Sequence, residues 1–364
     1  TAIAVISCVP AIIGLAALYP HWAILADGGI VQHTTEWLPA IGLSFSFRLD
    51  GLSLLFTLLI LIIGLLIILY ARYYLKPHEN VGKFYALLLC FKGSMLGIVL
   101  SSNLLLMMVF WELTSLTSFL LISFWTHKKD ARRGARMALA VTGGGGLALL
   151  AGILLIGNIV GSYELEDVLA AGDLIKNHSM YPVALTLVLL GAFTKSAQFP
   201  FHFWLPHAMQ APTPVSAYLH SATTVKAGIF LMARLYPALA GTEQWFYMVS
   251  FTGMATLLIG AYVAMFKHDL KGLLAHSTVS HLGLITLLFG MGTQLAAVAA
   301  VFHVINHAIF KASLFMAAGI IDHETGTRDM RRINGLWRYM PHTATLAMVA
   351  AASMAGVPLL NGFL

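Results

Sequence analysis

Residues 181–218 read YPVALTLVLLGAFTKSAQFPFHFWLPHAMQAPTPVSAY, an apolar run of helix length that leads into a proline-rich stretch. The prolines are Pro200, Pro206, Pro212 and Pro214. Proline removes a backbone donor and clashes with the preceding helical turn, so a helix over 181–199 must break soon after the run. Non-helical backbone at membrane depth persists only where protein or water covers it. We therefore predict a break between Lys195 and Pro206 whose freed backbone lines a polar cavity.

The composition of the whole chain is that of a membrane protein. Hydrophobic residues make up 59% of the 364 residues and charged residues only 10%, whereas a soluble domain carries about 25% charged residues. Runs of about 20 apolar residues predict membrane helices. These runs lie near 1–20, 50–74, 82–101, 103–126, 134–160, 181–199, 214–236, 244–266, 272–290, 295–321 and 341–364. The expected fold is an all-α membrane protein with about eleven transmembrane helices in the lipid bilayer.

The charged loops predict the orientation of these helices. Loops 71–83, 127–136, 267–271 and 322–338 are basic and fall on one side, while the acidic loop 161–180 falls on the other. Lys and Arg mark the cytoplasmic side, so we expect a multi-pass protein of the cell's inner (plasma) membrane. The net charge of +6 resides largely in these loops, and nucleic acid is not an expected partner.

A second interrupted helix is predicted at 341–364, where glycine and proline recur as Gly356, Pro358 and Gly362. Two interrupted helices in corresponding positions are typical of inverted-repeat transporters. We therefore expect a single transmembrane domain over 1–364. Repeat one would span about 82–236, and repeat two, which is incomplete, about 244–364.

Two smaller features indicate packing rather than chemistry. The run Gly143–Gly146 lacks the spacing of a phosphate-binding loop, so close approach of another helix is its expected role. Cys8 and Cys90 each lie inside an apolar run and match no zinc spacing. Neither feature predicts a metal or cofactor site.

Ionisable residues lie inside the apolar runs, where each one is costly. They are Lys92, Glu112, Lys195, His220, Lys226, His276, His281, His303, His307 and Lys311. The last three recur at every fourth position and share one helical face. Contacts between helices account for some such residues, and we favour that explanation for His281. For Lys92 the structural and functional explanations carry equal weight.

A proton relay is the function that these residues predict best. Glu112 and Lys195 are fully charged groups, which are poor contacts between helices at this depth. Burial favours neutral lysine, whereas a carboxylate about 4 Å away restores the charged form by about 4 kcal/mol. Movement of Glu112 relative to Lys195 would therefore make the lysine hold or release a proton. No cluster provides the ligand set of a metal site.

The same residues carry a resemblance to a known family. FWELTSLTSFLLISFW (110–125), residues 191–228, FHVINHAIFKASLFMAAGIIDHETGTRD (302–329) and MAGVPLLNGFL (354–364) resemble the antiporter-like subunits shared by respiratory complex I and Mrp-type cation/proton antiporters. The phrases QAPTPVSAYLHSATTVKAG and HETGTRD are most similar to the large A-subunit family of the Mrp antiporters. The resemblance implies inverted five-helix repeats with discontinuous helices.

The resemblance also implies roles for individual residues. Glu112 and Lys195 match the family's proton pair, and Lys226 and His220 match the next relay positions. Three residues match the central polar axis of the second half: His303, His307 and Lys311. The family has a further helix at the start and a further ionisable residue after the NGFL motif, so we expect the chain to be part of a longer protein. Lys92 occupies a position where the family has an apolar residue.

Three functional interpretations remain open. The first is secondary antiport of Na+ (or K+ or Li+) against H+ in a hetero-oligomer with other membrane subunits, which is transport rather than enzyme catalysis. The second is a proton-pumping subunit of NADH:quinone oxidoreductase or a related redox complex. The third is a purely structural scaffold, in which the central charges would be dispensable. No interpretation requires a cofactor in this chain.

Overall fold

The computed structural model describes residues 2–76 and 78–363; Thr1 and Leu364, at the ends of two predicted spans, lie outside the described residues. Within this part of the chain, eight helical segments are long and apolar enough to cross a membrane. They are α1 (Ala2–Leu18) with α2 (Trp22–Ala26), α3 (Gly51–Tyr74), α4 (Val81–Leu100), α5 (Leu104–Ile122), α6 (Lys129–Val160), α14 (Glu243–Trp245) with α15 (Phe251–Met265), α16 (Leu270–Gly290) and α17 (Gln294–Thr325). A mostly helical, multi-pass membrane protein is thereby confirmed.

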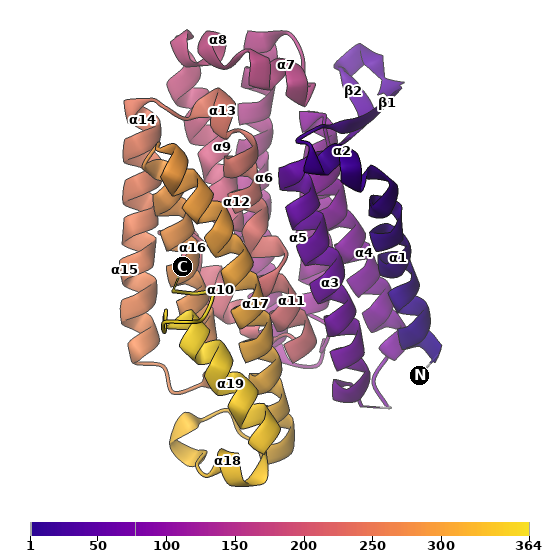
Figure 1. Ribbon diagram of the computed structural model, residues 1–364, viewed down its shortest axis with the longest axis vertical. Coiled ribbons are helices and arrows are strands. Elements are labelled where there is room, and N and C mark those ends of the chain that lie inside the picture. Colours follow the sequence, from indigo (N-terminus) through magenta and orange to yellow (C-terminus); the bar gives the residue numbers. More distant parts are fainter. Residues whose placement is uncertain (1, 77, 364) are drawn as a thin grey trace.

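Shorter helices complete the structure. In the membrane-spanning part they are α9 (Tyr181–Lys195), α10 (Trp204–His207), α11 (Thr213–Ser221), α12 (Thr224–Arg234) and α19 (Pro341–Met354). Between the long helices lie α7 (Leu165–Ala170), α8 (Gly172–Asn177), α13 (Tyr236–Leu239) and α18 (Leu336–Tyr339). The helices α7 and α8 lie at the end of the bundle that the acidic loop predicts to be outside the cell, and α18 lies at the opposite, basic end (Figure 1).

The all-α expectation is wrong in the segment between α2 and α3. There, β1 (Val31–Leu38) and β2 (Leu43–Leu49) form an antiparallel hairpin that pairs Val31 with Leu49. The sequence of β2, LSFSFRL, alternates between apolar and polar residues, which is the period of a strand. This alternating pattern is only seven residues long and lies beside long apolar runs. A search for apolar runs of helix length therefore did not detect it.

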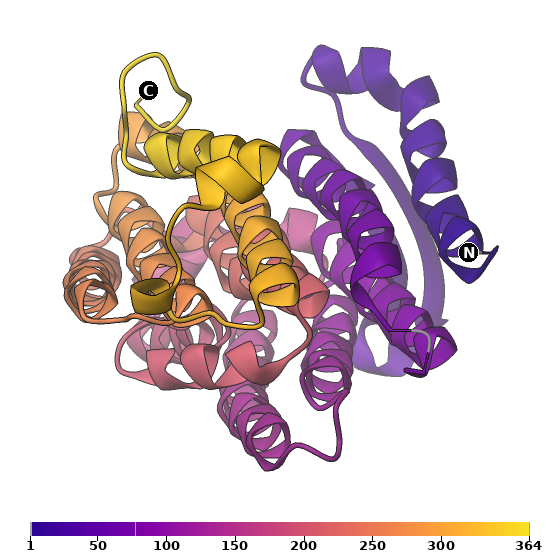
Figure 2. The ribbon, with the colours of Figure 1, turned by 90° about the horizontal axis from the view of Figure 1, so that it is seen from below.

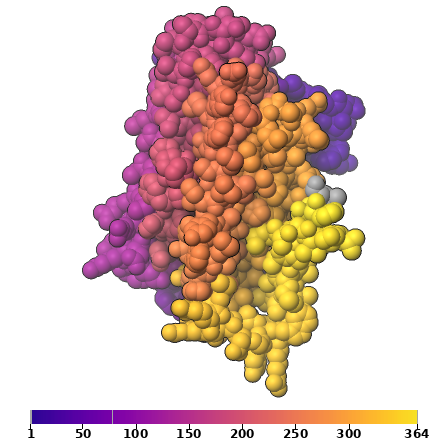
Figure 3. Space-filling view, turned by 90° about the vertical axis from the view of Figure 1, so that its left-hand side faces the viewer, coloured from indigo at the N-terminus to yellow at the C-terminus, as the bar shows by residue number. Residues whose placement is uncertain are grey.

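The helices form two groups with the broken helices between them. Figure 1 shows α1, α3, α4 and α5 on one side, α15, α16 and α17 on the other, and α9, α11 and α12 between. The view from below shows the same division (Figure 2). Figure 3 shows the α15 side, where α15 runs along the height of the molecule. Leu258 and Tyr262 on α15 are about 60% exposed, as expected for a surface that faces lipid.

The first predicted break is confirmed, because α9 ends at Lys195. Ala197 then adopts the left-handed conformation, with φ of 49°, and the Gln198 amide donates to the Phe193 carbonyl over 2.9 Å. This is the bond pattern that closes a helix at its C-terminus. A 3-10 turn (Phe201–Phe203), α10 and a second 3-10 turn (Ala208–Gln210) follow, so no helix continues through Phe199–Trp204.

The predicted span 214–236 is also divided, which the sequence pattern did not predict. The helix α11 ends at Ser221, and α12 begins at Thr224 after Thr223 leaves the helical conformation with φ −127° and ψ −108°. The Thr223 hydroxyl donates to the Tyr218 carbonyl over 2.8 Å. Serine and threonine side chains compete in this way with the helical backbone. The run Ser221–Thr224 therefore breaks the helix without proline.

The last predicted interruption is confirmed, because α19 ends at Met354 and Gly356 has a positive φ of 72°. A reciprocal amide pair fixes the following loop to α17. Asn306 Nδ2 donates to the Asn361 carbonyl, and Asn361 Nδ2 donates to Asn306 Oδ1, both over 2.8 Å. The Ser353 hydroxyl also donates to Asn361 Oδ1.

Replacing Asn306 by leucine should weaken this second break. Because the amide and carbonyl of Asn361 would both lose their partner, we expect a loss of about 1–2 kcal/mol in the free energy of unfolding. Thermal unfolding of the purified complex measures it. The exposed Asn158 of α6 provides a matched control, since Asn158→Leu removes no buried partner. Equal stability of the two variants would show that the amide pair does not hold the loop.

An ion-pair cluster joins the first helices to α12. Arg234, at the end of α12, donates to both carboxylate oxygens of Asp50, and Arg48 Nε lies 2.9 Å from Asp50 Oδ2. The side chains of Arg234 and Asp50 are only 7% and 14% exposed. Asp50 also caps α3 by accepting from the Ser53 amide. A single carboxylate thus positions both α3 and the second half of the divided span.

Candidate functional site

Lys195, the last residue of α9, reaches across to the middle of α5. Its Nζ donates to the Trp111 carbonyl over 2.9 Å and to the Ser115 hydroxyl over 2.7 Å. The ammonium also lies 5.1 Å from the centre of the Trp111 ring. The side chain is fully buried, and the break that follows it leaves room for this contact.

Glu112 lies beside these partners on α5, as the sequence predicts. Its Oε1 atom is buried and makes no hydrogen bond among the described residues. No ion pair within 4.0 Å joins Glu112 and Lys195 in this part of the chain. The structure thus brings the two residues to adjacent positions between α5 and α9 without direct contact. Contact between the two charges therefore requires movement of at least one of these side chains.

The glycine run of α6 makes room for this pair. A Cβ atom at Gly146 would collide with Glu112 Oε1, and one at Gly145 would collide with the hydroxyl of Thr194, the residue before Lys195. A Cβ atom at Gly143 or Gly144 would meet nothing within 4 Å. Gly145 and Gly146 therefore permit close packing of helices, as predicted. The absence of a side chain at Gly146 leaves room for the Glu112 carboxylate.

Replacing Gly146 by alanine should displace the Glu112 carboxylate. Because the atom that the methyl group meets is the end of a flexible side chain, we expect a small loss of stability together with a lower proton flux in the assembled complex. Gly143→Ala and Gly144→Ala are matched controls, because they add the same methyl group to the same helix in open space. Flux and thermal unfolding midpoints of the three variants test the prediction. Equal values for all three would place Glu112 outside the transport path.

His220 and Lys226 lie on either side of the break between α11 and α12. Lys226 Nζ donates to the Val304 carbonyl of α17 over 2.8 Å. His220 is fully buried, neither of its ring nitrogens has a partner among the described residues, and its ring lies 5.7 Å from that of Phe315 on α17. The division of the span that the sequence missed therefore separates two predicted site residues.

The face of α17 that carries His303, His307 and Lys311 forms a cluster with a residue from α16. His281 Nδ1 lies 3.0 Å from His303 Nε2, with the rings stacked, and the His281 ring lies 5.6 Å from that of His307. Both nitrogens of His307 are buried without a partner among the described residues. The contact of His281 with His303 joins α16 to α17, as expected for a residue that holds helices together, but periodicity within one helix could not reveal which residue of α17 it meets.

Lys311 ends this face at the second helix break. Its Nζ donates to the Ser277 hydroxyl over 2.7 Å and lies 3.4 Å from the sulfur of Met354, the last residue of α19. The side chain is fully buried. Lys195, Lys226 and Lys311 thus each lie at or beside an interrupted helix.

Lys271 is a buried lysine that the sequence assigned to a loop. It lies in the first turn of α16, and its Nζ donates to the Ala211 carbonyl over 2.9 Å, with the Ser216 hydroxyl at 3.4 Å. It lines a cavity of about 470 Å3 together with Asp322. Ala211 lies between the 3-10 turn that ends at Gln210 and α11, where a donor from another helix can reach its carbonyl, and no local pattern in the sequence pairs it with Lys271.

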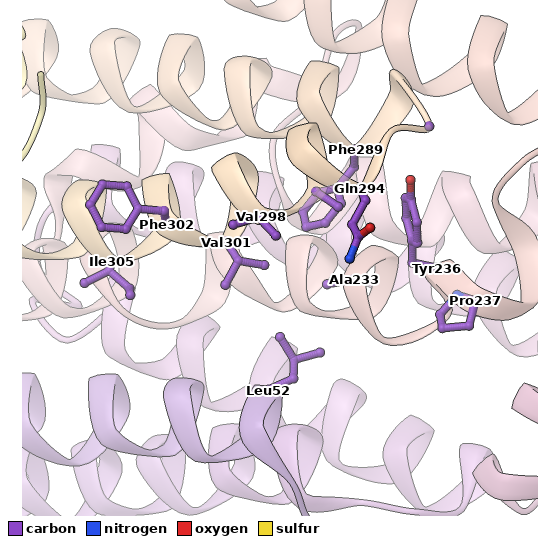
Figure 4. Close-up of a pocket in the computed structure, with 12 residues that line it drawn as sticks. Leu52, Ala233, Tyr236, Pro237, Phe289, Gln294, Val298, Val301, Phe302 and Ile305 are labelled. Atoms are coloured by element: carbon purple, nitrogen blue, oxygen red, sulfur yellow. The ribbon is translucent and has the colours of Figure 1, made fainter. Parts of the chain in front are cut away.

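A second hollow, at the opposite end of the bundle, is apolar. It has a volume of about 760 Å3 and lies between α3, α12, α16 and α17 (Figure 4). Val298, Val301 and Ile305 line it along one stripe of α17. None of the predicted site residues lines this groove.

Comparison with known proteins places the sequence among membrane transport subunits. Residues 101–364 match the family described as "NADH:quinone oxidoreductase/Mrp antiporter, TM". Residues 37–85 match the family described as "NADH-Ubiquinone oxidoreductase (complex I), chain 5 N-terminus".

Individual relatives show the same similarity. The chain is 65% identical over 349 residues to the probable K(+)/H(+) antiporter A/B subunit of Rhizobium meliloti, covering 96% of this chain and 35% of that protein. It is 52% identical over 359 residues to the Na(+)/H(+) antiporter A subunit of Alkalihalophilus pseudofirmus, covering 94% of this chain and 45% of that protein. The chain therefore spans less than half the length of these curated relatives.

Two solved structures share the fold. A chain of the Mrp complex from Dietzia superposes with a TM-score of 0.90 at 43% identity, covering 96% of this chain and 38% of that one. A chain of an archaeal membrane-bound sulfane sulfur reductase superposes with a TM-score of 0.85 at 24% identity, covering 99% of this chain and 73% of that one. The second likeness shows a common fold alone.

Proposed function

The chain belongs to the family of NADH:quinone oxidoreductase and Mrp antiporter transmembrane subunits, and we propose that it forms the proton path of a monovalent cation/proton antiporter. The observation that carries the proposal is a series of buried ionisable side chains that crosses the bundle from α5 to α17. Such groups are rare at membrane depth and mark proton relays. The chain is accordingly a transporter subunit rather than an enzyme.

The path that we propose begins at Glu112 and Lys195. From there it continues to Lys226, because α12 packs directly on α9, where a Cβ at Gly228 would collide with the Ala192 carbonyl. Lys226 meets α17 at Val304, the residue after His303. The last step runs through the α17 face to Lys311.

The histidines supply groups that can donate and accept at neutral pH. Imidazole changes its charge near this pH and offers two ring nitrogens. His281 and His303 already share a hydrogen bond. Neither ring nitrogen of His307 has a partner among the described residues, so both can bind a further group. His220 supplies a further such ring beside the break between α11 and α12. Water entering the polar breaks would complete the contacts between these groups.

The arrangement of broken helices supports two inverted repeats. We propose that repeat one spans about 82–236 and contains the break after Lys195, and that repeat two spans about 244–364 and contains the break after Met354. Under this proposal α9, the pair α11–α12, and α19 complete eleven membrane crossings with the eight long segments. The basic loops would then face the cytoplasm of a bacterial plasma membrane.

The similarity to A subunits of K(+)/H(+) and Na(+)/H(+) antiporters supports Na+ or K+ as the exchanged cation. The likeness to a chain of the Dietzia Mrp complex supports other membrane subunits as partners. The match of residues 37–85 to a complex I chain supports a second candidate, a proton-pumping subunit of a redox complex. Antiport requires only a cation gradient, whereas redox pumping requires electron transfer, and this separates the two candidates.

The experiment is cation-dependent proton flux in vesicles that contain the full complex. With antiport, Na+ or K+ alone dissipates an imposed pH gradient. The Lys195→Met variant abolishes this response, because no titratable amine remains at that position of the proposed path. Lys129→Met is the matched control, since Lys129 is exposed at the start of α6. Flux that requires NADH and quinone instead would support the redox candidate. Normal flux in the Lys195→Met variant would remove the proposed path.

A further inference from the structure

Lys92 is a buried lysine outside the proposed path. It lies in the middle of α4 and is 3% exposed. Its Nζ makes no hydrogen bond among the described residues, whereas Lys195, Lys226 and Lys311 each donate to a carbonyl or hydroxyl. A charged ammonium in such surroundings is strongly disfavoured. The surroundings of Lys92 in this structure therefore favour the neutral amine over the ammonium form.

An acceptor for the charged form lies close by on α11. A Cβ atom built on Gly64 of α3 would lie 2.9 Å from the Tyr218 hydroxyl and 3.4 Å from Lys92 Cδ. The absence of a side chain at Gly64 thus lets the tyrosine and the lysine meet over α3. Lys92 Nζ lies two bonds beyond Cδ, so a rotation at the end of the side chain can bring it to the hydroxyl oxygen.

Tyr218 can accept this contact without losing its own. Its hydroxyl donates to the Ile60 carbonyl over 2.8 Å, which leaves the lone pairs of the phenol oxygen available. The Tyr218 ring is fixed by an edge-on contact with Phe91, the neighbour of Lys92 on α4, at 5.7 Å between ring centres. The acceptor is therefore held in place before the lysine becomes charged.

Tyr218 also connects Lys92 to the proposed path. It lies on α11, the short helix that ends one residue after His220 and precedes the break to Lys226. A charge on Lys92 therefore acts on the part of the chain that carries two proposed relay groups.

Few other titratable groups face Lys92. On α1, which packs on α4, Cys8 is a free thiol. On α4 itself, the Tyr85 hydroxyl donates to the Ile68 carbonyl. The ionisable groups of α5, α11 and α12 are directed elsewhere: Glu112 toward Gly146, His220 toward Phe315, and Lys226 toward Val304.

We propose that Lys92 is an additional proton-binding group of the antiporter, whose ammonium form is held by the Tyr218 hydroxyl and thereby acts on the broken span α11–α12. The amine binds a proton at its Nζ lone pair, and one N–H of the ammonium then donates to the phenol oxygen. Release is the reverse step. This inference rests on the proposed antiport function and adds a proton site to it.

The test compares Lys92→Met and Tyr218→Phe in vesicles containing the full complex. Each change removes the held positive charge, one by deleting the amine and the other by deleting its acceptor. Because a nearby positive charge opposes proton binding at His220 and Lys226, both variants should shift the pH profile of antiport to higher pH. The expected shift is about one pH unit, which is the effect of a unit charge about 12 Å away at an effective dielectric of about 20.

Controls separate this inference from the antiport proposal. Lys83→Met, an exposed lysine at the start of the same helix, should keep the wild-type profile. The double variant should match Lys92→Met, because both changes act through one contact. Wild-type profiles for Lys92→Met and Tyr218→Phe overturn the inference if Lys195→Met still abolishes flux. If Lys195→Met also transports normally, the antiport proposal itself fails. The Tyr218→Phe variant keeps the packing of the ring. It therefore tests the inference even if the Lys92→Met variant does not assemble.

Discussion

Lys311→Arg and Lys226→Arg are each expected to lower antiport by about 100-fold while the complex still assembles, the lower end of what a lost acid–base group causes. Arginine keeps its positive charge under all physiological conditions, whereas buried lysine can lose its proton. Both lysines are fully buried and each donates to an acceptor on a neighbouring helix. A fixed charge would preserve that contact and block proton release. Cation-dependent proton flux measures the effect.

The matched control is Lys129→Arg, at the exposed start of α6, which should transport as the wild type does. Assembly is checked by copurification of the partner subunits. If the two buried variants assemble and transport normally, a permanent charge is sufficient at these positions. Both lysines would then be structural anchors, and the relay would have to run through the histidines alone.

Asp50→Asn is expected to lower the free energy of unfolding by about 3–5 kcal/mol, the usual loss when one partner of a buried ion pair is removed. Arg234 is 7% exposed and would be left as a charge without its carboxylate. The cap of α3 would be weakened as well, since the Ser53 amide donates to Asp50. Thermal or denaturant unfolding of the purified complex measures the loss.

Asp329→Asn is the control for an ion pair in water. Asp329 contacts Arg331, whose side chain is 67% exposed, and water screens such exposed pairs, so that they contribute little to stability. A loss as large as that of Asp50→Asn would show that exposure does not separate the two pairs. An Asp50→Asn variant as stable as the wild type would show that the cluster does not hold α3 to α12.

The pH dependence of this cluster follows from the charge of Asp50. Burial alone would raise the pKa of Asp50, but the hydrogen bond and charge of Arg234, with hydrogen bonds from Ser53, outweigh it and hold the pKa well below its usual range. The stabilisation is therefore complete above the unfolded pKa of about 3.9. It is lost only as the pH falls toward the lower folded pKa. The difference between wild type and Asp50→Asn should thus stay constant from neutral pH to about pH 5.

The sequence predicted the features that leave a local signature. Prolines after Lys195 predicted the first break, and charged residues within apolar runs identified Lys195, Lys226 and Lys311, which are buried, and Glu112, which is partly buried. These predictions succeed because proline geometry and the cost of a buried charge act within one helix or at one residue.

The features that the sequence missed depend on contacts between segments. The break at Thr223 arises from side-chain hydroxyl groups that compete with the backbone, and hydroxyl residues do not break most helices. His281 joins its cluster only because α16 packs on α17. Lys271 is buried because the carbonyl of Ala211, sixty residues earlier in the chain, faces it. Spacing along one helix contains none of this information.

The breaks after Lys195 and Met354 and the lysine contacts between helices have a consequence for the membrane voltage. The series of ionisable groups passes from helix to helix between Lys195 and α17, and then follows the axis of α17 over the eight residues from His303 to Lys311, which span about 12 Å. Moving one elementary charge across the full membrane takes about 2.3 kcal/mol per 100 mV. A proton moving along α17 from His303 to Lys311 would cross up to about 12 Å of a hydrocarbon core about 30 Å thick, and therefore part of this field. The electrical work of transport would then be divided between this step along α17 and the steps that connect the series to the two aqueous phases.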